Sequence, residues 1–331
     1  MIAIFSYELT AFPLFAPPPE VGPTESQASL RLMSRFGPAF AGAMVAKRAG
    51  IFERQGIHID IREGTDGDEP FSTVINGTDT FGSARADTFL SARAKGARIV
   101  AFAAGLIESQ AAFYVLARSN LRTPADFVGR RVGRRPGDDT ATVYDALVTK
   151  LGLAQSRIEE ISVGGDLSSL IHGDVDVWPG HVGDEDYALE QKKIDYSIVD
   201  PARYGVDLLG TVYFAAEQTI TQRPDLVRRF LSGLIAGWEL VYNDYTTSVP
   251  IIVSFDSKRL SPDYVRFALD RQRPNLRPLA TRYGEYSEHQ WRLLQEILVQ
   301  QRRLDRTANI SEAVTYDFLH DVYRKPLSPA D

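Results

Sequence analysis

The order of apolar and polar residues predicts alternating strands and helices in the first part of the chain. Apolar and polar side chains alternate strictly over Ile57-His58-Ile59-Asp60-Ile61, which is typical of a half-buried strand. Residues 39–48 are mostly small or apolar and precede Gly50, so they predict a helix that a glycine terminates. Apolar runs at 98–103 and 111–117 predict buried strands. This alternation indicates an α/β lobe with a mainly parallel sheet.

A second α/β unit follows the first. Thr123-Pro124-Ala125-Asp126 is a helix start, because threonine caps an N-terminus, proline fits the first turn and aspartate complements the helix dipole. Strand and helix patterns alternate from there to a strand at 197–199. The run Gly210-Thr211-Val212-Tyr213-Phe214 predicts a strand that returns to the first lobe, and amphipathic helices follow from Pro224. Ser261-Pro262-Asp263 predicts the start of one of these helices by the same capping pattern.

These elements predict two lobes, which a length of 331 residues also favours. Lobe 1 is expected to contain residues 29–117 and 213–331, and lobe 2 residues 118–212. The chain is expected to cross between the lobes near 117–119 and 210–213. Two crossings form a hinge, and a hinge between two α/β lobes predicts a ligand cleft.

Charge and composition exclude several partners and chemistries. The formal net charge is −6, and the densest basic run, residues 130–135, is short, so no nucleic-acid partner is expected. The chain contains no cysteine, which excludes disulfides, thiolate nucleophiles and cysteine-ligated metals. We expect neither a metal nor a cofactor.

The N-terminal region is a poor secretory signal. Residues 1–28 contain five prolines and are expected to form an extended segment. The stretch from Ile2 to Leu9 is apolar, but it contains Glu8 and lacks a positive start. No apolar run approaches the roughly 18–20 residues that span a bilayer. Either the protein is not exported or its leader lies outside this sequence.

Five segments carry a family resemblance. They are residues 41–57, which include Gly50-Ile51-Phe52, and residues 76–82, 122–133, 170–177 and 222–231. In this order they resemble the solute-binding proteins of ABC importers for nitrate, sulfonates, taurine and thiamine precursors. The resemblance implies a two-lobed periplasmic-binding-protein type II fold with a helical C-terminal region.

The same resemblance implies partners and a compartment. It implies a small-molecule ligand, and as protein partners an ABC permease in the membrane and its ATPase. It also implies a monomer in the periplasm, with the cytoplasm as the alternative location.

The thiamine-precursor branch of that family is the nearest in the segment 180–206. Ala202-Arg203-Tyr204-Gly205-Val206 is similar to the Ala-Asp-Tyr-Gly-Val of that branch. The branch usually carries Asn-Glu-Pro where this chain has Asp184-Glu185-Asp186. A pyrimidine-like heterocycle is therefore the favoured ligand, and a sulfonate, taurine, nitrate or riboflavin stays open.

The loops after the predicted strands supply the candidate ligand-binding residues, because ligands of open α/β sheets bind at the carboxyl ends of strands. These candidates are Arg35, Phe36, Gly82, Ser83, Arg85, Glu108, Ser109, Arg134, Asp138, Asp139, Thr140, Trp178, His181, Asp184 and Glu185.

The candidates have different predicted roles. Phe36 and Trp178 come from opposite lobes and could sandwich a planar ring, although Trp178 could equally complete the core of lobe 2. Gly82-Ser83 could offer backbone N–H groups to an anion, or Ser83 could cap a helix. The carboxylates are expected to cap helices or to accept hydrogen bonds from amino and ring N–H groups of the ligand.

An enzyme on the same fold is the competing interpretation, and a ligand sensor is a third. A fungal-type pyrimidine synthase and a bacterial aromatic sulfinate desulfinase resemble this family. The first has a cysteine-rich motif and the second needs a thiol nucleophile, so a chain without cysteine has neither the motif nor the nucleophile. It also has no His-x-x-x-His pair and no serine nucleophile elbow. We therefore expect a binding protein and no catalytic residue.

Overall fold

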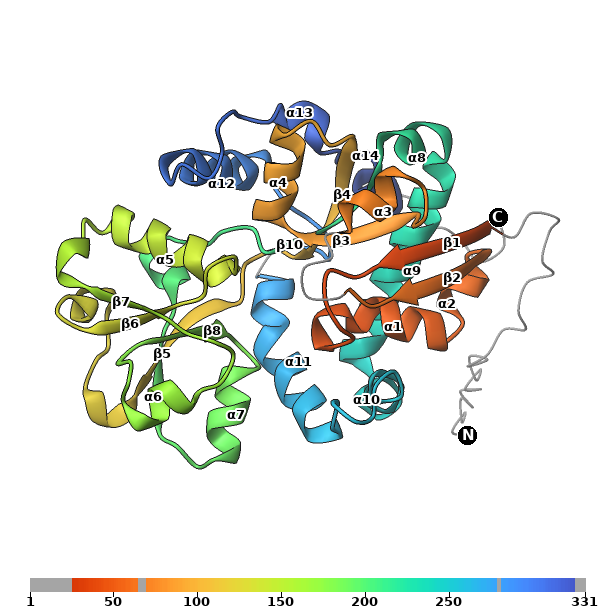
Figure 1. Ribbon diagram of the computed structural model, residues 1–331. Coiled ribbons are helices and arrows are strands. Elements are labelled where there is room, and N and C mark those ends of the chain that lie inside the picture. The colour runs from red at the N-terminus through yellow and green to blue at the C-terminus, as the bar shows by residue number, and fades with distance from the viewer. Residues whose placement is uncertain (1–25, 65–69, 279–280, 325–331) are drawn as a thin grey trace, which may run out of the picture.

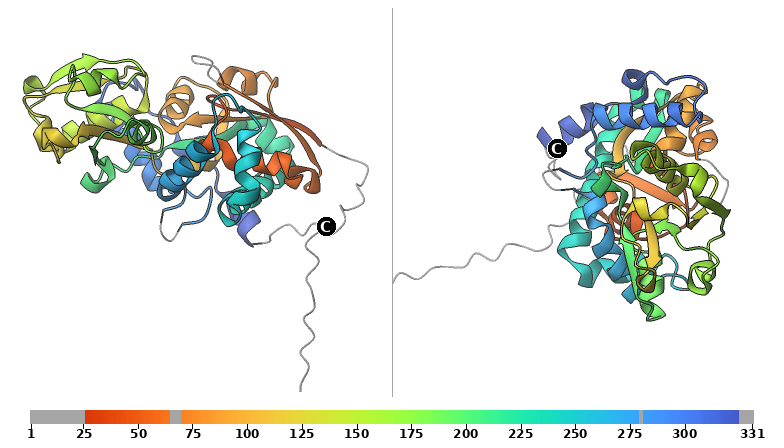
Figure 2. Two further views of the ribbon diagram at one scale, coloured as in Figure 1. Left: turned by 90° about the horizontal axis from the view of Figure 1, so that it is seen from below. Right: turned by 90° about the vertical axis from the view of Figure 1, so that its left-hand side faces the viewer.

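The computed structural model describes residues 26–64, 70–278 and 281–324, which form two lobes lying end to end (Figures 1 and 2). Lobe 1 is built on a sheet in the order β2 (Ile57–Arg62), β1 (Ser26–Arg31), β3 (Phe81–Arg85), β10 (Thr211–Ala216) and β4 (Ile99–Leu106). Lobe 2 contains a sheet in the order β8 (Trp178–His181), β5 (Ala111–Leu116) and β9 (Tyr196–Val199), and the pair β6 (Arg131–Arg134) and β7 (Glu159–Ser162).

The two-lobed α/β fold is confirmed, but its sheets are mixed rather than mainly parallel. Strand β1 runs parallel to β2 and β3, whereas β10 is antiparallel to both β3 and β4. Strand β10 has this direction because it re-enters lobe 1 from lobe 2. In lobe 2, β5 is antiparallel to β8 and β9, and β6 is parallel to β7.

Helices cover the sheets of both lobes. Those of lobe 1 are α1 (Ala41–Arg48), α2 (Ile51–Arg54), α3 (Phe71–Ile75), α4 (Ala86–Ala94), α8 (Glu217–Gln222), α9 (Pro224–Asn243), α10 (Tyr245–Val253), α11 (Pro262–Leu276), α12 (Glu288–Gln300), α13 (Ile310–Ala313) and α14 (Asp317–Arg324). Those of lobe 2 are α5 (Asp139–Lys150), α6 (Ser168–His172) and α7 (Glu185–Gln191). The predicted start at Thr123 begins a 3-10 turn, Pro124–Phe127, with a capping box between Thr123 and Asp126. None of the helices in the described ranges is long and apolar enough to cross a membrane.

The first crossing between the lobes lies earlier in the chain than expected. Strand β4 ends at Leu106 in lobe 1 and β5 begins at Ala111, already paired within the sheet of lobe 2. Residues 107–110 therefore form this crossing, instead of 117–119. The chain returns just before β10, and the Ser109 N–H donates to the Leu208 carbonyl at 2.8 Å, which joins the two crossings.

The start of lobe 1 also differs slightly from the expectation. Strand β1 begins at Ser26, three residues before the predicted boundary, and pairs with β2 from that residue on. The remainder of the predicted N-terminal segment, residues 1–25, lies outside the described residues.

Close helix packing holds the core of lobe 1 together. The predicted apolar stripe of α9, which includes Phe230 and Trp238, is buried against the sheet and α1. A side chain on Gly237 would collide with the carbonyl oxygen of Gly42 in α1. The backbones of α1 and α9 can therefore touch only because this position has no side chain.

Gly237→Ala should lower the free energy of unfolding by about 1–3 kcal/mol, because the added methyl forces two helices apart. Urea denaturation measures this loss. Gly165→Ala is the matched control, since a methyl there meets no atom within 4 Å. Equal stabilities of the two variants would show that the contact between α1 and α9 does not require a glycine at position 237.

Candidate ligand-binding site

A cavity of about 370 Å³ opens between the lobes. We call it the interlobe cleft. Lobe 1 contributes the loop after β1, residues 34–40, and lobe 2 contributes the turn after β8 with Val182 and Asp184. Gln110 of the first crossing and residues of α11 complete the wall. Three predicted site residues therefore line this cleft, namely Arg35, Phe36 and Asp184.

Phe36 forms an aromatic wall whose position is fixed by its neighbours. Its N–H donates to Glu63 Oε1 at 2.6 Å, and its ring lies edge-on to Phe255 with 5.0 Å between the ring centroids. The same Glu63 oxygen accepts a bond from Arg259 at 2.9 Å. Arg35 next to it is exposed and has no hydrogen bond or ion pair with another described residue. A cation is thus left available at the mouth of the cleft.

Helix α11 lies between the two lobes and contacts both (Figure 1). It begins at Ser261, whose hydroxyl accepts from the Tyr264 N–H. On the lobe 1 side Gln272 donates to the Pro38 carbonyl at 2.9 Å, and on the lobe 2 side Tyr264 donates to Asp184 Oδ1 at 2.6 Å. Farther along, Arg271 pairs with Asp186 of α7 at 3.0 Å. These contacts make α11 a wall of the cleft.

Asp184 is the one carboxylate among the described residues that line the cleft. Desolvation between the lobes raises its pKa, the bond from Tyr264 opposes that rise, and the negative charge of Glu185 adds to it. A hydrogen-bond donor on a ligand would stabilise the ionised form of this partly desolvated carboxylate.

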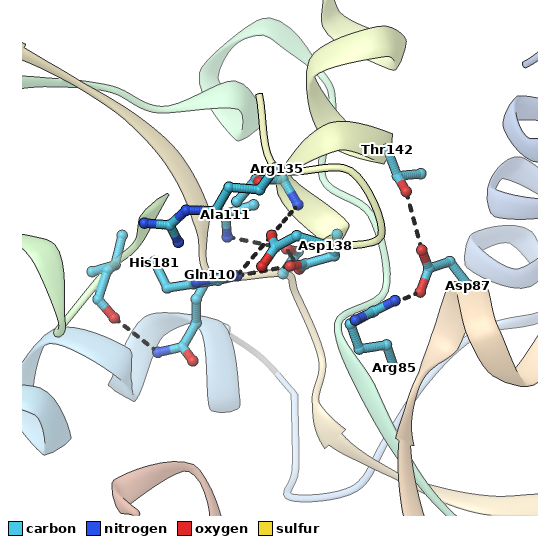
Figure 3. A network of polar contacts seen from close by, with 12 residues as sticks. Arg85, Asp87, Gln110, Ala111, Arg135, Asp138, Thr142 and His181 are labelled. Atoms are coloured by element: carbon cyan, nitrogen blue, oxygen red, sulfur yellow. Dashed lines mark hydrogen bonds and ion pairs between the residues drawn. The ribbon is translucent and has the colours of Figure 1, made fainter. Parts of the chain in front are cut away.

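A second group of predicted residues meets at the N-terminus of α5. His181 Nε2 lies 2.7 Å from Asp139 Oδ1, and the Ser109 hydroxyl donates to Asp139 Oδ2 at 2.9 Å. Asp138 caps the helix by accepting from the Thr140 N–H, and its Oδ1 lies 3.8 Å from His181 Nε2. Figure 3 shows this network beside Gln110. It joins lobe 2 to Ser109 of the first crossing.

The same group is the one among the described residues with the spacing of a metal site. The ligand atoms of Asp138, Asp139 and His181 all lie within 4.8 Å of one another, and imidazole with carboxylates is a donor set that zinc accepts. The hydrogen bonds just given already pair each of these groups, so the geometry is explained as a half-buried ion pair.

The pair Asp139–His181 holds both groups in their charged forms. Desolvation lowers the pKa of His181, but the charges of Asp139, Asp138 and Glu185 outweigh it and raise this pKa to about 10. For the carboxyl group of Asp139 burial has the opposite effect and acts to raise the pKa. The positive charges of His181 and Arg85 outweigh it and bring the pKa of Asp139 well below its ordinary value.

Arg85 connects the lobes rather than facing solvent. Its Nε contacts Asp87 Oδ1 at 3.2 Å, and its Nη2 donates to the Gly137 carbonyl of lobe 2 at 2.9 Å. The other oxygen of Asp87 accepts from the Thr142 hydroxyl of α5 at 3.0 Å (Figure 3). Arg303 also contacts the Thr142 hydroxyl. These contacts join lobe 1 to α5 and the loop before it in lobe 2.

Trp178 lies in the core of lobe 2 and does not reach the cleft. It is the first residue of β8 and 0% exposed, so the core-packing alternative replaces the stacking one. The Arg135 guanidinium lies 5.0 Å from the ring centroid and pairs with Glu185 at 2.8 Å. Glu185 also accepts from the His181 N–H at 2.7 Å, so this predicted ligand carboxylate is internally paired.

The remaining predicted residues lie away from the cleft. Gly82 and Ser83 belong to strand β3, because α4 begins only at Ala86, and the Ser83 hydroxyl accepts from the Met33 N–H. They therefore do not form an anion-binding turn. Arg134 pairs with Asp145 and Glu160, and Thr140 is buried in the first turn of α5. Glu108 lines a different cavity.

Several cleft residues escape prediction because the sequence does not show that their segments lie between the lobes. Tyr264 and Gln272 lie on a helix that the cap at Ser261 predicts, but its amphipathic pattern does not say which lobe it covers. Gln110 escapes prediction because the first crossing is expected at 117–119, whereas it lies at 107–110. Only its position next to the predicted Ser109 could have drawn attention to it.

His181 is expected to stay protonated between pH 6 and 8. Its folded-state pKa of about 10 exceeds the ordinary 6.5, so it stabilises the fold fully below pH 6.5 and this stabilisation is lost as the pH rises towards 10. NMR titration of the five histidines, with His181→Gln for assignment, measures this. In Asp139→Asn the His181 pKa should fall; a His181 that titrates near pH 6.5 in the unmodified protein contradicts the ion pair.

Trp178→Ala should destabilise lobe 2 by about 3–5 kcal/mol, because it empties a fully buried ring site. Urea unfolding followed by circular dichroism gives this value. Leu151→Ala, at a position 38% exposed, should change stability by less than about 0.5 kcal/mol. A stable Trp178→Ala variant with weakened ligand binding would instead support the stacking role.

The sequence is similar to proteins of known name. The chain is 25% identical over 230 residues to a 4-amino-5-hydroxymethyl-2-methylpyrimidine phosphate synthase of Legionella pneumophila, covering 68% of this chain and 71% of the relative. It is 22% identical over 232 residues to a formylaminopyrimidine-binding protein of Halalkalibacterium halodurans, covering 66% of this chain and 70% of the relative.

A solved structure shares the fold. The periplasmic aliphatic sulphonate-binding protein SsuA of Escherichia coli superposes with a TM-score of 0.73 at 16% identity, covering 88% of this chain and 92% of that chain. The resemblance to the nitrate, sulfonate, taurine and thiamine-precursor proteins and the periplasmic-binding-protein fold are thereby confirmed. The family model described as NMT1/THI5 like matches residues 37–246, well over half of the chain, and the protein therefore belongs to the NMT1/THI5-like family.

Proposed function

We propose that the protein binds a small aminopyrimidine-like heterocycle in the interlobe cleft, as the solute-binding component of an ABC importer, and catalyses no reaction. The observation that carries this proposal is the placement of Phe36 and Asp184, from opposite lobes, on one cavity of about 370 Å³. An aromatic face stacks on a planar ring, and a carboxylate accepts from amino or ring N–H groups.

The charges of the cleft favour a heterocycle over a doubly charged anion. Arg259 is paired with Glu63 and Asp256, which leaves Arg35 as the cation of the described lining that no carboxylate engages. Asp184 would repel an anion from the opposite wall. A neutral ring with an amino group can donate a hydrogen bond to Asp184, and it carries no negative charge that Asp184 would repel.

Contacts between the lobes support closure around the ligand. Lobe 1 and the first crossing are joined to lobe 2 by Ser109 with Asp139, Arg85 with Gly137, and α11 with α7. A ligand that touches both Phe36 and Asp184 binds the closed arrangement better than an open one. It would therefore shift the population towards closure.

The second candidate function is a pyrimidine synthase, which the name of the Legionella relative favours. Against it stands the absence of cysteine from the sequence, since the fungal-type enzyme that resembles this family has a cysteine-rich motif. His181 is held protonated by Asp139, so it is a poor general base near neutral pH. Product formation on incubation with candidate substrates would favour the enzyme, and stoichiometric binding without turnover the binding protein.

Isothermal calorimetry should find tighter binding of 4-amino-5-hydroxymethyl-2-methylpyrimidine and formylaminopyrimidine than of thiamine, riboflavin, taurine, alkanesulfonates or nitrate. A ligand at a hundred times its dissociation constant should add about 2.7 kcal/mol of stability, which a thermal shift detects. A sulfonate that binds more tightly than every pyrimidine overturns the assignment of ligand class and leaves the binding function standing.

Phe36→Ala and Asp184→Asn should each weaken pyrimidine binding at least tenfold, because they remove the stacking face and the acceptor. Asp263→Asn is the matched control, since it makes the same change at an exposed position in the first turn of α11. The site assignment is wrong if Asp184→Asn and Asp263→Asn bind the ligand equally well.

A further inference from the structure

Glu108 was predicted as a ligand-binding residue but takes no part in the interlobe cleft. It lies on the first crossing and lines a second cavity of about 410 Å³. This cavity, which we call the hinge cavity, shares none of its described lining residues with the interlobe cleft. It is within the size range of small-molecule sites in proteins.

The described wall of the hinge cavity combines apolar surface with negative charge. Ile107 and Leu319 give aliphatic surface, and Tyr286 and Tyr316 give aromatic surface. Glu108 and Glu285 bring two carboxylates, and no lysine or arginine occurs among the lining residues that the structure describes. Such a wall is complementary to a cation with an apolar body.

The two carboxylates differ in whether the protein neutralises them. Glu285 lies 2.6 Å from the Arg282 guanidinium and also accepts from the Arg282 N–H. Glu108 is half-buried, and within the described ranges no hydrogen bond or ion pair reaches its carboxylate. Desolvation and the negative charges of Asp207 and Asp200 raise its pKa. A partly buried carboxylate without a partner is stabilised by any cation that can approach it.

We propose that the hinge cavity binds a small organic ammonium ion, with Glu108 as its counter-ion. The aromatic faces of Tyr286 and Tyr316 and the aliphatic side chains beside them suit the organic part of such a ligand. This site is separate from the proposed pyrimidine site, and it needs neither Phe36 nor Asp184.

A ligand at Glu108 contacts the segment on which the hinge depends. The Glu108 N–H donates to the Asn275 carbonyl at the end of α11 at 2.9 Å, and the next N–H, of Ser109, bonds to Leu208. Both the wall of the interlobe cleft and the return crossing are thus tied to this residue. An ammonium ion that binds one arrangement of the lobes more tightly would shift the equilibrium between them.

The test uses the full chain and benzylammonium as the probe, with benzyl alcohol and benzoate as neutral and anionic analogues. Ligand-observed NMR titration at pH 7.5 should show that benzylammonium binds at least tenfold more tightly than either analogue. Benzyl alcohol binding as tightly as benzylammonium, or no binding of benzylammonium at millimolar concentration, overturns the proposal. This comparison needs no variant.

Variants then locate the site. Glu108→Gln should weaken benzylammonium binding at least tenfold, whereas Glu296→Gln, which removes the same charge from an exposed position of α12, should change it less than twofold. Asp184→Asn should likewise leave it unchanged, which separates this site from the interlobe cleft. Equal affinities of the Glu108→Gln and Glu296→Gln variants would contradict the role of Glu108.

Discussion

The arrangement of both lobes depends on the close approach of two backbone crossings. The N–H of Ser109 on the first crossing bonds to the carbonyl of Leu208 on the second. A side chain on Gly210 would come within 2.8 Å of the Glu108 carbonyl oxygen, so a glycine is needed where the chains meet. The two crossings are therefore held against each other where the chain passes between the lobes. The cleft residues on either side then take their positions from the hinge.

Buried charge near the hinge is organised in pairs that cross between elements. Asp139 and His181 form an ion pair, and the Ser109 hydroxyl donates to the second oxygen of Asp139. Arg85 of lobe 1 donates to a carbonyl of the loop before α5. Removing one partner of such a pair leaves an uncompensated charge in a poorly solvated site, which lowers the stability of the fold. These pairs therefore fix the orientation of α5 and β8 and hold the turn that carries Asp184 in place.

The fold by itself does not distinguish binding from catalysis in this family. Relatives of similar identity are named as a binding protein and as a synthase. What separates the two possibilities is the chemistry of the cleft, where Phe36, Asp184 and Tyr264 offer a stacking face and hydrogen-bonding groups. The neighbouring histidine is already engaged by a carboxylate. Function must therefore be argued from these side chains.

The sequence by itself determined the kind and order of most elements. The strict alternation at 57–61 became β2, the caps at Thr123 and Ser261 begin a 3-10 turn and α11, and the apolar stripe after Pro224 became α9. These features are readable because periodicity and capping act between residues a few positions apart. The order of elements and the chain length predicted two lobes, and the family resemblance added the periplasmic-binding-protein type II fold. Loop positions alone predicted Arg35, Phe36 and Asp184 of the cleft.

Only the tertiary structure decided which residues meet. Asp139 and His181 are 42 positions apart, and Tyr264 joins Asp184 from a helix 80 positions later. The antiparallel direction of β10, the burial of Trp178 and the place of the first crossing likewise depend on how strands pair across the chain. Strand pairing and side-chain burial are long-range properties, so no local pattern of apolar and polar residues specifies them.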